Sequence, residues 1–429
     1  MDTIYALATA RGKAGVAVIR VSGPDAFDVC RQLTLDVPLA GQHRLMVLRA
    51  LDGQLLDKAL VLAFAAPSSF TGENTVEFQV HGSSAVVQAV QNSLRETQLC
   101  RLAEPGEFTR RAMLNNKLDL AQVEGLGDLI EAETEVQRRQ AMNVFTGKLR
   151  ALVDSWRESL IRAIALIEVT IDFADEDVPV EVMPEVSELV AGVLVDLKIE
   201  IAGSYVSERV RDGFEVAIVG PPNVGKSTLL NALAGREAAI TSSIAGTTRD
   251  IIEVRMDLGG LPVTFLDTAG LREATDEIEK IGVLRALKRA ERADLRVYLR
   301  NAETEIAAIE LGPDDISLIG KGDLLSNTAD SVSGKSGFGV DQLVRDITDR
   351  LSDLVATSGT ATHERHRLAM QAAVIEINLA VDEITLRTDR PELVAEHLRN
   401  STRALDMLIG RVDVENVLDE IFSRFCLGK

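Results

Sequence analysis

One segment constrains the fold of this chain more than any other. Residues 220–227 read Gly-Pro-Pro-Asn-Val-Gly-Lys-Ser and fit the pattern G-x-x-x-x-G-K-[ST] throughout. The apolar run at 215–219 predicts a strand before this segment, and residues 228–234 predict a helix after it. A strand, a glycine-rich loop and a helix in this order can hold a phosphate, because backbone N–H groups and the helix N-terminus face the anion. The chain therefore contains a P-loop α/β domain.

The side chains of this loop predict how phosphates and cations bind. Lys226 would reach the β- and γ-phosphates of a nucleotide, and Ser227 would ligate Mg²⁺. Asn223 offers an amide oxygen to a monovalent cation beside the phosphates. Such a cation would supply the charge that an arginine finger supplies elsewhere, a factor of about 10³–10⁵ in rate. The other candidate nucleotide-binding residues here are Val224, Gly225 and Thr228.

Motifs downstream of the loop indicate a GTPase. Asp267-Thr268-Ala269-Gly270 follows an apolar run at 263–266, about 40 residues past the P-loop lysine. Asp267 is therefore expected at a strand end, where it can hold the Mg²⁺ shell. Between the two motifs lies Gly246-Thr247-Thr248-Arg249-Asp250, in which a switch threonine should contact Mg²⁺ and the γ-phosphate.

Residues 320–323 predict which base is bound. Gly320-Lys321-Gly322-Asp323 follows an apolar run and stands where a GTPase carries Asn-Lys-x-Asp. Asp323 can accept hydrogen bonds from guanine N1–H and the 2-amino group, each worth roughly 1.5–3 kcal/mol, whereas adenine offers neither pattern. Ser333-Gly334-Lys335 occupies the usual Ser-Ala-Lys position. Asp323 therefore predicts guanine selectivity. We also predict weakened nucleotide affinity, because Gly320 lacks the side chain that normally braces the base loop.

The residue that orients the attacking water is not given by the local pattern. Leu271 follows the Asp-Thr-Ala-Gly motif, where many small GTPases place a glutamine. Four acids in the next turn are alternatives, and a solvated switch face is the expected state of at least three. They are Glu273, Asp276, Glu277 and Glu279.

Composition limits the other possible functions. With 429 residues, two to four domains are expected. The net charge of −20 argues against a broad basic face along nucleic acid, although a local patch or a partner could still hold such a substrate. Three cysteines are too few for a disulfide framework. Neither a signal peptide nor an apolar run of about 18 residues is present, so a cytoplasmic protein without a membrane segment is expected.

Hydrophobic periodicity divides the chain. Strands are expected at 14–21, 60–64 and 76–80 and a helix at 84–97, within an α+β domain of residues 1–117. Helical patterns occupy 118–212 and 356–429, on either side of an α/β segment at 213–355. The predicted fold class is a multidomain α/β plus α protein. Its Ras-like P-loop G domain is inserted into a discontinuous helical domain, because neither helical half alone makes an obvious closed core.

Several short motifs outside the α/β segment carry a family resemblance. They are Asp2-Thr3-Ile4, Ile19-Arg20-Val21-Ser22-Gly23, Thr71-Gly72-Glu73-Asn74 with Glu77 and His81-Gly82, Pro105-Gly106-Glu107-Phe108-Thr109-Arg110-Arg111-Ala112, Lys117-Leu118-Asp119-Leu120 and Cys426-Leu427-Gly428-Lys429. Each is weak alone. In this order and spacing, together with the Gly-Thr-Thr-Arg-Asp switch, they resemble the MnmE (TrmE) family of tRNA-modification GTPases, among the TrmE-Era-EngA-like GTPases.

The resemblance implies an N-terminal domain that dimerises and binds a tetrahydrofolate derivative, 5-formyl or methylene. Carried over by motif, Arg20, Glu77 and Lys117 would contact the folate, and Lys429 would join them. Arginine and lysine suit the anionic glutamate tail, and Glu77 could pair with the pterin amine and ring N–H. Cys426 has two interpretations. It is either a free thiol in a frayed end or a functional, catalytic cysteine near the folate, and the resemblance favours the second.

In the G domain the resemblance selects Glu279 as the water-orienting residue. It implies potassium on Asn223, the backbones of Ser242 and Ile244, and Thr247, and Mg²⁺ on Ser227 and Thr248. The remaining residues of this potassium-ordered loop are Ser243, Ala245 and Gly246. The G domains of a homodimer are expected to meet across this loop when GTP is bound.

The implied function is the GTP-hydrolysing subunit of a tRNA modification complex. With a flavoprotein partner, MnmG (GidA), it would add an aminomethyl or carboxymethylaminomethyl group to C5 of wobble uridine 34, using a folate one-carbon unit. The chain has no G-x-G-x-x-G fingerprint, so FAD is expected on the partner only. A ribosome-assembly GTPase switch is the alternative, but it would need an appended basic RNA-binding module. A septin- or dynamin-like scaffold is disfavoured by the folate motifs.

Overall fold

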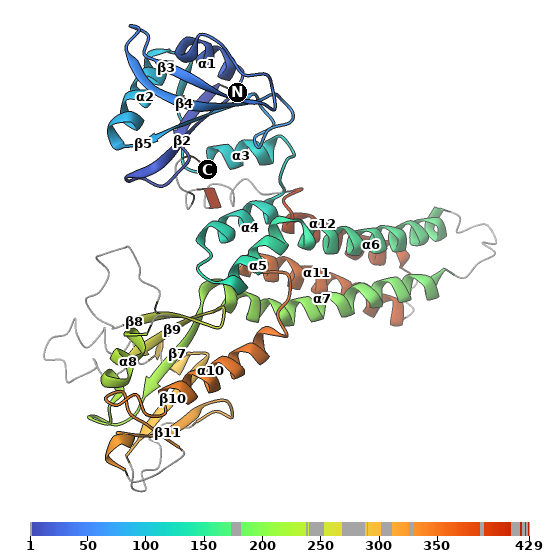
Figure 1. Ribbon diagram of the computed structural model, residues 1–429. Helices are drawn as coiled ribbons and strands as arrows, with labels where there is room; N and C mark the ends of the chain where they lie inside the picture. Colours follow the sequence, from blue (N-terminus) through green and yellow to red (C-terminus); the bar gives the residue numbers. More distant parts are fainter. Residues whose placement is uncertain are drawn as a thin grey trace, which may run out of the picture. The chain divides into compact units, whose positions relative to one another are not determined.

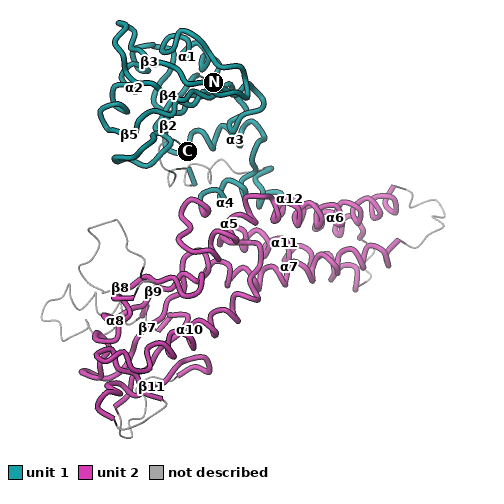
Figure 2. Tube along the Cα trace, viewed as in Figure 1, with its two compact units in different colours: residues 1–127, 406–429 teal, residues 128–405 magenta. Residues whose placement is uncertain are grey.

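The structure of the 429-residue chain is a computed structural model. It describes residues 2–172, 182–236, 239, 253–267, 288–289, 291–301, 311–325, 330–386, 390–412, 421–422, 425 and 428. The chain forms two compact units, residues 1–127 with 406–429 and residues 128–405 (Figure 2).

The first unit contains a six-stranded sheet with the order β3-β4-β5-β2-β1-β6 (Figure 1). Its strands are β1 (Thr3–Leu7), β2 (Ala14–Ser22), β3 (His43–Arg49), β4 (Leu55–Phe64), β5 (Thr75–Gly82) and β6 (Cys100–Leu102). Its helices are α1 (Ala26–Thr34), α2 (Ser84–Glu96), α3 (Glu107–Leu114) and the first part of α4 (Leu120–Glu131). The strands expected at 14–21, 60–64 and 76–80 and the helix expected at 84–97 are confirmed.

The two faces of this sheet differ. On β2, alternate residues such as Ile19 and Val21 are buried in a core that also takes in apolar residues of α1 and α2. On the opposite face, Phe108 of α3 packs with residues of β1. Farther along that face, Leu45 on the edge strand β3 is 57% exposed, and it pairs with Leu60 on β4. Apolar surface therefore remains exposed on the β3–β4 side of the sheet.

The last residues of the chain belong to this first unit. Phe422 packs with Leu120 and Val123 of α4, and its ring lies against Gly106 at the start of α3. Gly428 lies against Leu7 at the end of β1. The sequence predicts that residues 356–429 together form the second helical half. In the structure residues 406–429 group with the first unit, and of their described side chains Ile421, Phe422 and Phe425 pack in the core around α4.

The second unit contains several helices outside its α/β segment. They are α5 (Glu135–Phe145), α6 (Lys148–Asp172), α7 (Met183–Asp212), α11 (Glu364–Thr385) and α12 (Pro391–Leu408). α7 packs against both α6 and α11, so helices from before and after the α/β segment lie in one bundle (Figure 1). Ion pairs join α12 to α6 (Arg399–Glu168, 2.5 Å) and α6 to α7 (Arg162–Glu185, 3.1 Å). Within the described residues, no helix is long and apolar enough to cross a membrane.

The α/β segment forms a second six-stranded sheet with the order β12-β11-β10-β7-β9-β8. Its strands are β7 (Phe214–Val219), β8 (Glu253–Leu258), β9 (Leu261–Asp267), β10 (Leu295–Arg300), β11 (Ile316–Gly320) and β12 (Ser331–Val332). All pairs are parallel except β8–β9. Helices α8 (Lys226–Ala234) and α10 (Val340–Val355) contribute apolar residues to its core. Because β7, β9, β10 and β11 run parallel, the loops after them leave from one edge of the sheet.

We expect the helical bundle to depend on its apolar stripe along α6. Leu160 is fully buried one turn from Trp156, the only tryptophan of the chain, which is 2% exposed. The substitution Leu160→Ala should lower the free energy of unfolding by about 2–5 kcal/mol, because it removes buried contacts and leaves a cavity. Urea unfolding followed by Trp156 emission would measure the loss.

The matched control is Leu368→Ala on α11, where the side chain is 56% exposed. This change should shift the free energy of unfolding by no more than about 0.5 kcal/mol. Equal effects of the two substitutions would show that the α6 stripe does not carry the stability of the bundle.

Candidate functional site

The P-loop joins β7 to α8 and has the backbone that a phosphate cradle needs. Asn223 has a φ of 60° and Gly225 a φ of 113°, so the chain turns sharply before the helix begins at Lys226. The Lys226 side chain is almost buried, and its Nζ donates to the carbonyl oxygens of Gly220 (2.7 Å) and Pro221 (2.9 Å). An ammonium group held over the loop and the N-terminus of α8 together favour an anion here.

A second loop carries the acceptor for a base. After β11, Lys321 adopts a φ of 57° and a 3₁₀ turn (Gly322–Leu324) presents Asp323. The Ser333 hydroxyl donates to Asp323 Oδ1 at 2.6 Å. This hydrogen bond, assisted by the positive charges of Lys335 and Lys321, holds the pKa of the Asp323 carboxyl below its usual range. Asp323 is therefore a charged acceptor, as recognition of guanine N1–H and the 2-amino group requires.

A cavity of about 270 Å³ connects these two loops. The P-loop and α8 contribute Val224, Gly225, Thr228 and Leu229 to its lining, and the base loops contribute residues 320–321, 323–324 and 332–335. Nine of the residues that were predicted for nucleotide binding therefore line one cavity. Residues of the P-loop and of the base loops thus share one cavity, as binding of a nucleoside phosphate requires.

Other predicted nucleotide residues can be followed only in part. Asp267 is the last residue of β9 and pairs with Ile218 of β7, so its backbone lies at the strand edge from which the P-loop leaves. Its predicted place at a strand end is confirmed. The remaining residues lie outside the part of the chain that the structure describes. They are Ser242, Ser243, Ile244, Ala245, Gly246, Thr247, Thr248, Thr268, Ala269, Gly270 and Glu279.

In the first unit, Arg20 and Glu77 form a pair across two strands. They are register partners on β2 and β5, and Arg20 Nε donates to Glu77 Oε1 at 2.8 Å. The Arg20 guanidinium also lies 5.6 Å from the ring centre of Phe70 and 5.7 Å from that of Phe108. The sequence predicts no role for Phe70 or Phe108, because nothing in their spacing places them beside an arginine. The four side chains combine charge, a hydrogen-bond acceptor and flat apolar surface.

Lys117 and the chain end lie against neighbouring parts of the same unit. Lys117 Cε is 3.3 Å from the point that a Cβ at Gly72 would occupy, so it packs on the loop that precedes β5. Gly428 lies beside Leu7, one residue after Ala6, which pairs with Arg20. Cys426 and Lys429 lie outside the described residues.

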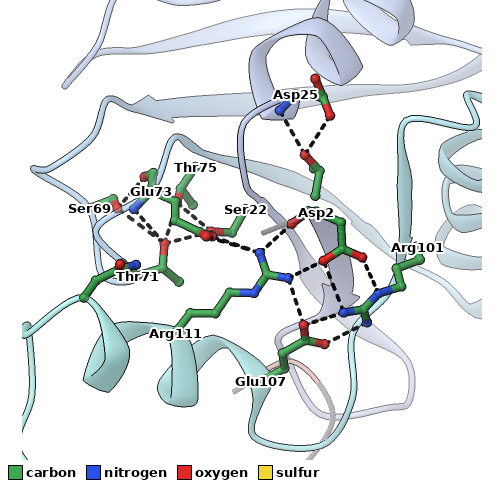
Figure 3. Close-up of polar contacts among 12 residues, drawn as sticks. Asp2, Ser22, Asp25, Ser69, Thr71, Glu73, Thr75, Arg101, Glu107 and Arg111 are labelled. Carbon is green, nitrogen blue, oxygen red and sulfur yellow. Dashed lines mark hydrogen bonds and ion pairs between the residues drawn. The ribbon is translucent and has the colours of Figure 1, made fainter.

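Arg111 of α3 holds this region together in a way the sequence did not predict (Figure 3). Its guanidinium is 4% exposed and donates to Glu107 Oε1 (2.8 Å), Asp2 Oδ1 (2.9 Å) and Glu73 Oε2 (3.1 Å). Glu73 also accepts from Ser22 Oγ at 2.8 Å. The spacing of Glu107 and Arg111 on one helix face was a usable signal, but the partners from the N-terminus and the 71–74 loop were not.

Two carboxyl groups of this network, those of Glu107 and Asp2, have a lowered pKa. Burial by itself would raise the pKa of Glu107, but hydrogen bonds from Arg101, the Glu104 amide and Arg111 outweigh it and hold the pKa below its usual value. The hydrogen bond from Arg101 likewise lowers the pKa of Asp2. The network thus fixes the 71–74 loop, against which Lys117 packs.

A strand–loop–helix phosphate cradle with a charged base acceptor defines a P-loop nucleotide-binding protein of the GTPase class. Family models match most of the chain: "GTP-binding protein TrmE N-terminus" over residues 3–117 and "MnmE helical domain" over residues 120–426. Proteins named "tRNA modification GTPase MnmE" from Roseobacter denitrificans and Ruegeria sp. TM1040 are 58% and 57% identical over 429 residues. Each match covers 100% of both chains. The chain belongs to the MnmE (TrmE) family and is a GTP-hydrolysing enzyme.

We expect Arg111→Met to loosen α3 and the 71–74 loop. Glu107 and Glu73 would lose their buried cationic partner, which costs about 3–5 kcal/mol. Hydrogen exchange of residues 71–74 and 107–114, followed by mass spectrometry, would measure the loss locally. Arg110→Met, at the exposed neighbour on α3, should leave this exchange nearly unchanged.

The same protection should depend on pH in the wild type. A carboxyl whose pKa is lowered by folding stabilises the fold fully above its unfolded value, about 4.3 for glutamate. That contribution is lost as the pH falls through the lower folded value, so protection should fall below about pH 4. An Arg111→Met protein with wild-type exchange and wild-type pH dependence would contradict this role for the network.

Proposed function

We propose that this chain is the GTP-hydrolysing subunit of a tRNA modification complex. The complex would add a carboxymethylaminomethyl or aminomethyl group to C5 of wobble uridine 34. One observation carries the proposal: the similarity to proteins named tRNA modification GTPase covers 100% of this chain and 100% of the relative. The P-loop site and the N-terminal site therefore belong to the same shared architecture.

The proposed domains follow the periodicity of the sequence. Residues 1–117 form the folate-binding and dimerisation domain, residues 118–212 and 356–429 the two helical halves, and residues 213–355 the G domain. Packing of α11 on α7 supports a helical domain made from both sides of the G domain. The return of residues 406–429 to the first unit ties the end of the second half to the folate domain.

A tetrahydrofolate, 5-formyl or methylene, is the proposed ligand of the N-terminal domain. Arg20 and Lys117 suit its anionic tail, and Glu77 suits the pterin amine and ring N–H. The rings of Phe70 and Phe108 beside Arg20 offer apolar surface to a flat heterocycle. When bound, the folate would supply the one-carbon unit. Lys429 and Cys426 enter this proposal through the family resemblance alone, Lys429 as a folate contact and Cys426 as a catalytic residue.

A homodimer is the proposed assembly. The β3–β4 side of the first sheet exposes Leu45, Val47 and Leu55, and a second copy of the chain would remove this apolar surface from water. A flavoprotein partner, MnmG, would hold FAD and complete the redox chemistry. Because the net charge is −20, we expect that partner to supply much of the basic surface for tRNA.

In the G domain, Mg²⁺ is proposed on Ser227 and Thr248. Potassium is proposed on Asn223, the backbones of Ser242 and Ile244, and Thr247. Asn223 has a φ of 60°, a conformation that asparagine adopts more readily than most other residues, so asparagine suits this turn of the P-loop. Glu279 is proposed to orient the attacking water. GTP binding would bring two G domains together, and hydrolysis would drive the conformational cycle of the complex.

Mass analysis of tRNA nucleosides from a deletion strain tests the proposed function directly. We expect the C5 modification of wobble uridine to disappear, to return with the wild-type gene, and not to return with Lys226→Ala, which removes the phosphate-binding ammonium. Intact wobble-uridine modification in the deletion strain would exclude this function.

Potassium dependence tests the cation site. Replacing potassium by sodium should slow GTP hydrolysis by roughly tenfold or more, because the cation stands in for the charge of an arginine finger. The Asn223→Ala protein should be slow in both salts. If the wild-type rates in the two salts are equal, the assignment of Asn223 to a cation is wrong.

A further inference from the structure

Gly320, at the end of β11, lies directly against the P-loop. A Cβ built on Gly320 would overlap the carbonyl oxygen of Val224 and would lie 2.9 Å from Val224 Cγ2. The φ of Gly320 is not in the left-handed region, so the restriction comes from space and not from backbone conformation. Its main obstacle is a backbone carbonyl, which cannot rotate away as a side chain can. Only glycine fits here with the two loops at this separation.

Gly334, in the second base loop, lies directly against the backbone of α8. A Cβ there would overlap the carbonyl oxygen of Thr228 and would lie 2.5 Å from the Thr228 carbonyl carbon and 2.6 Å from Leu229 Cα. Leu229 is buried in the core of the sheet, which holds this turn of α8 in place. The second base loop is therefore seated on helix backbone, again through a glycine.

Both glycines touch one continuous segment, residues 224–229, which carries the phosphate-binding lysine. The loops are also tied to each other, because Ser333 donates to Asp323 at 2.6 Å. The distance from the base acceptor to the phosphate cradle is thus set by two glycine-to-backbone contacts. These two positions are also where this chain departs from the Asn-Lys-x-Asp and Ser-Ala-Lys patterns of other GTPases.

We propose that Gly320 and Gly334 are specificity-determining positions for the guanine nucleotide, because they set how near Asp323 lies to the P-loop. The proposal rests on GTP being the nucleotide bound. A side chain at either position separates Asp323 from the phosphate cradle, so a nucleotide anchored by its phosphates loses its hydrogen bonds to Asp323. In this chain the residues common in other GTPases would therefore weaken binding.

Substitutions at position 320 distinguish this proposal from an alternative, in which Gly320 only lacks the asparagine side chain that braces the base loop. If a missing brace were the whole effect, Gly320→Asn would bind GDP more tightly than the wild type and Gly320→Ala would equal the wild type. Under the proposal, both Gly320→Ala and Gly320→Asn bind GDP more weakly than the wild type, and asparagine is no better than alanine. Gly334→Ala should weaken binding in the same way.

The experiment uses the full-length protein with Mg²⁺ and measures dissociation constants for GDP and for inosine diphosphate, which lacks the 2-amino group. We expect GDP affinity to fall roughly 10–100-fold in the position 320 and 334 variants, the range of one lost hydrogen bond to a charged group. The GDP-to-inosine diphosphate affinity ratio should also fall toward that of Asp323→Ala. A ratio taken within one preparation does not depend on the fraction of folded protein.

Gly235→Ala is the matched control. Gly235 ends α8 with a φ of −80°, and the nearest atoms to its Cβ position are 3.6 and 3.9 Å away, so this change should leave both affinities within about twofold. Tighter GDP binding by Gly320→Asn, or unchanged ratios in Gly320→Ala and Gly334→Ala, would overturn the proposal. If one position does not tolerate substitution, the other gives the same test. Wild-type preference for GDP over ADP checks the nucleotide assignment separately.

Discussion

Parallel pairing of β7 with β9 and β10, and of β10 with β11, is the constraint on which the nucleotide site depends. Parallel strands all end at the same edge, so loops that are far apart in sequence meet there. The P-loop, the backbone of Asp267 and the loop of Asp323 are gathered by this pairing. The buried apolar core of the sheet holds these loops in fixed positions relative to one another. The backbone contacts of Gly320 and Gly334 then set the distance between Asp323 and the phosphate cradle.

Much of this site was predictable because its signals are local. The P-loop pattern needs only eight consecutive residues, and the strand before it and helix after it are visible from apolar spacing. Asp267 was predicted at a strand end from the apolar run before it. The closeness of Gly320 to Val224 was not predictable. In the sequence, glycine in place of the usual asparagine indicates a lost side-chain interaction and gives no sign of a contact with the P-loop backbone.

In the N-terminal unit, less of the candidate site could be predicted from the sequence. Its strands followed from alternation, but the way its polar residues meet depends on chain segments that only the fold brings together. Arg20 and Arg111 lie in one unit and differ sharply. Arg111 is enclosed by three carboxylates and fixes the loop next to Lys117, whereas Arg20 is paired with Glu77 and lies close to two aromatic rings. A sequence motif that contains an arginine does not say which of these roles it has.

The return of residues 406–429 to the first unit has a consequence for biosynthesis. The N-terminal residues leave the ribosome first, yet the core around Leu120 and Phe422 cannot close until residues 421–425 have been made. At about 5–20 residues per second, the intervening segment 128–405 delays this closure by roughly 15–55 s. During that interval Leu120 and Val123 of α4 lack the contact with Phe422 that buries them in the finished fold.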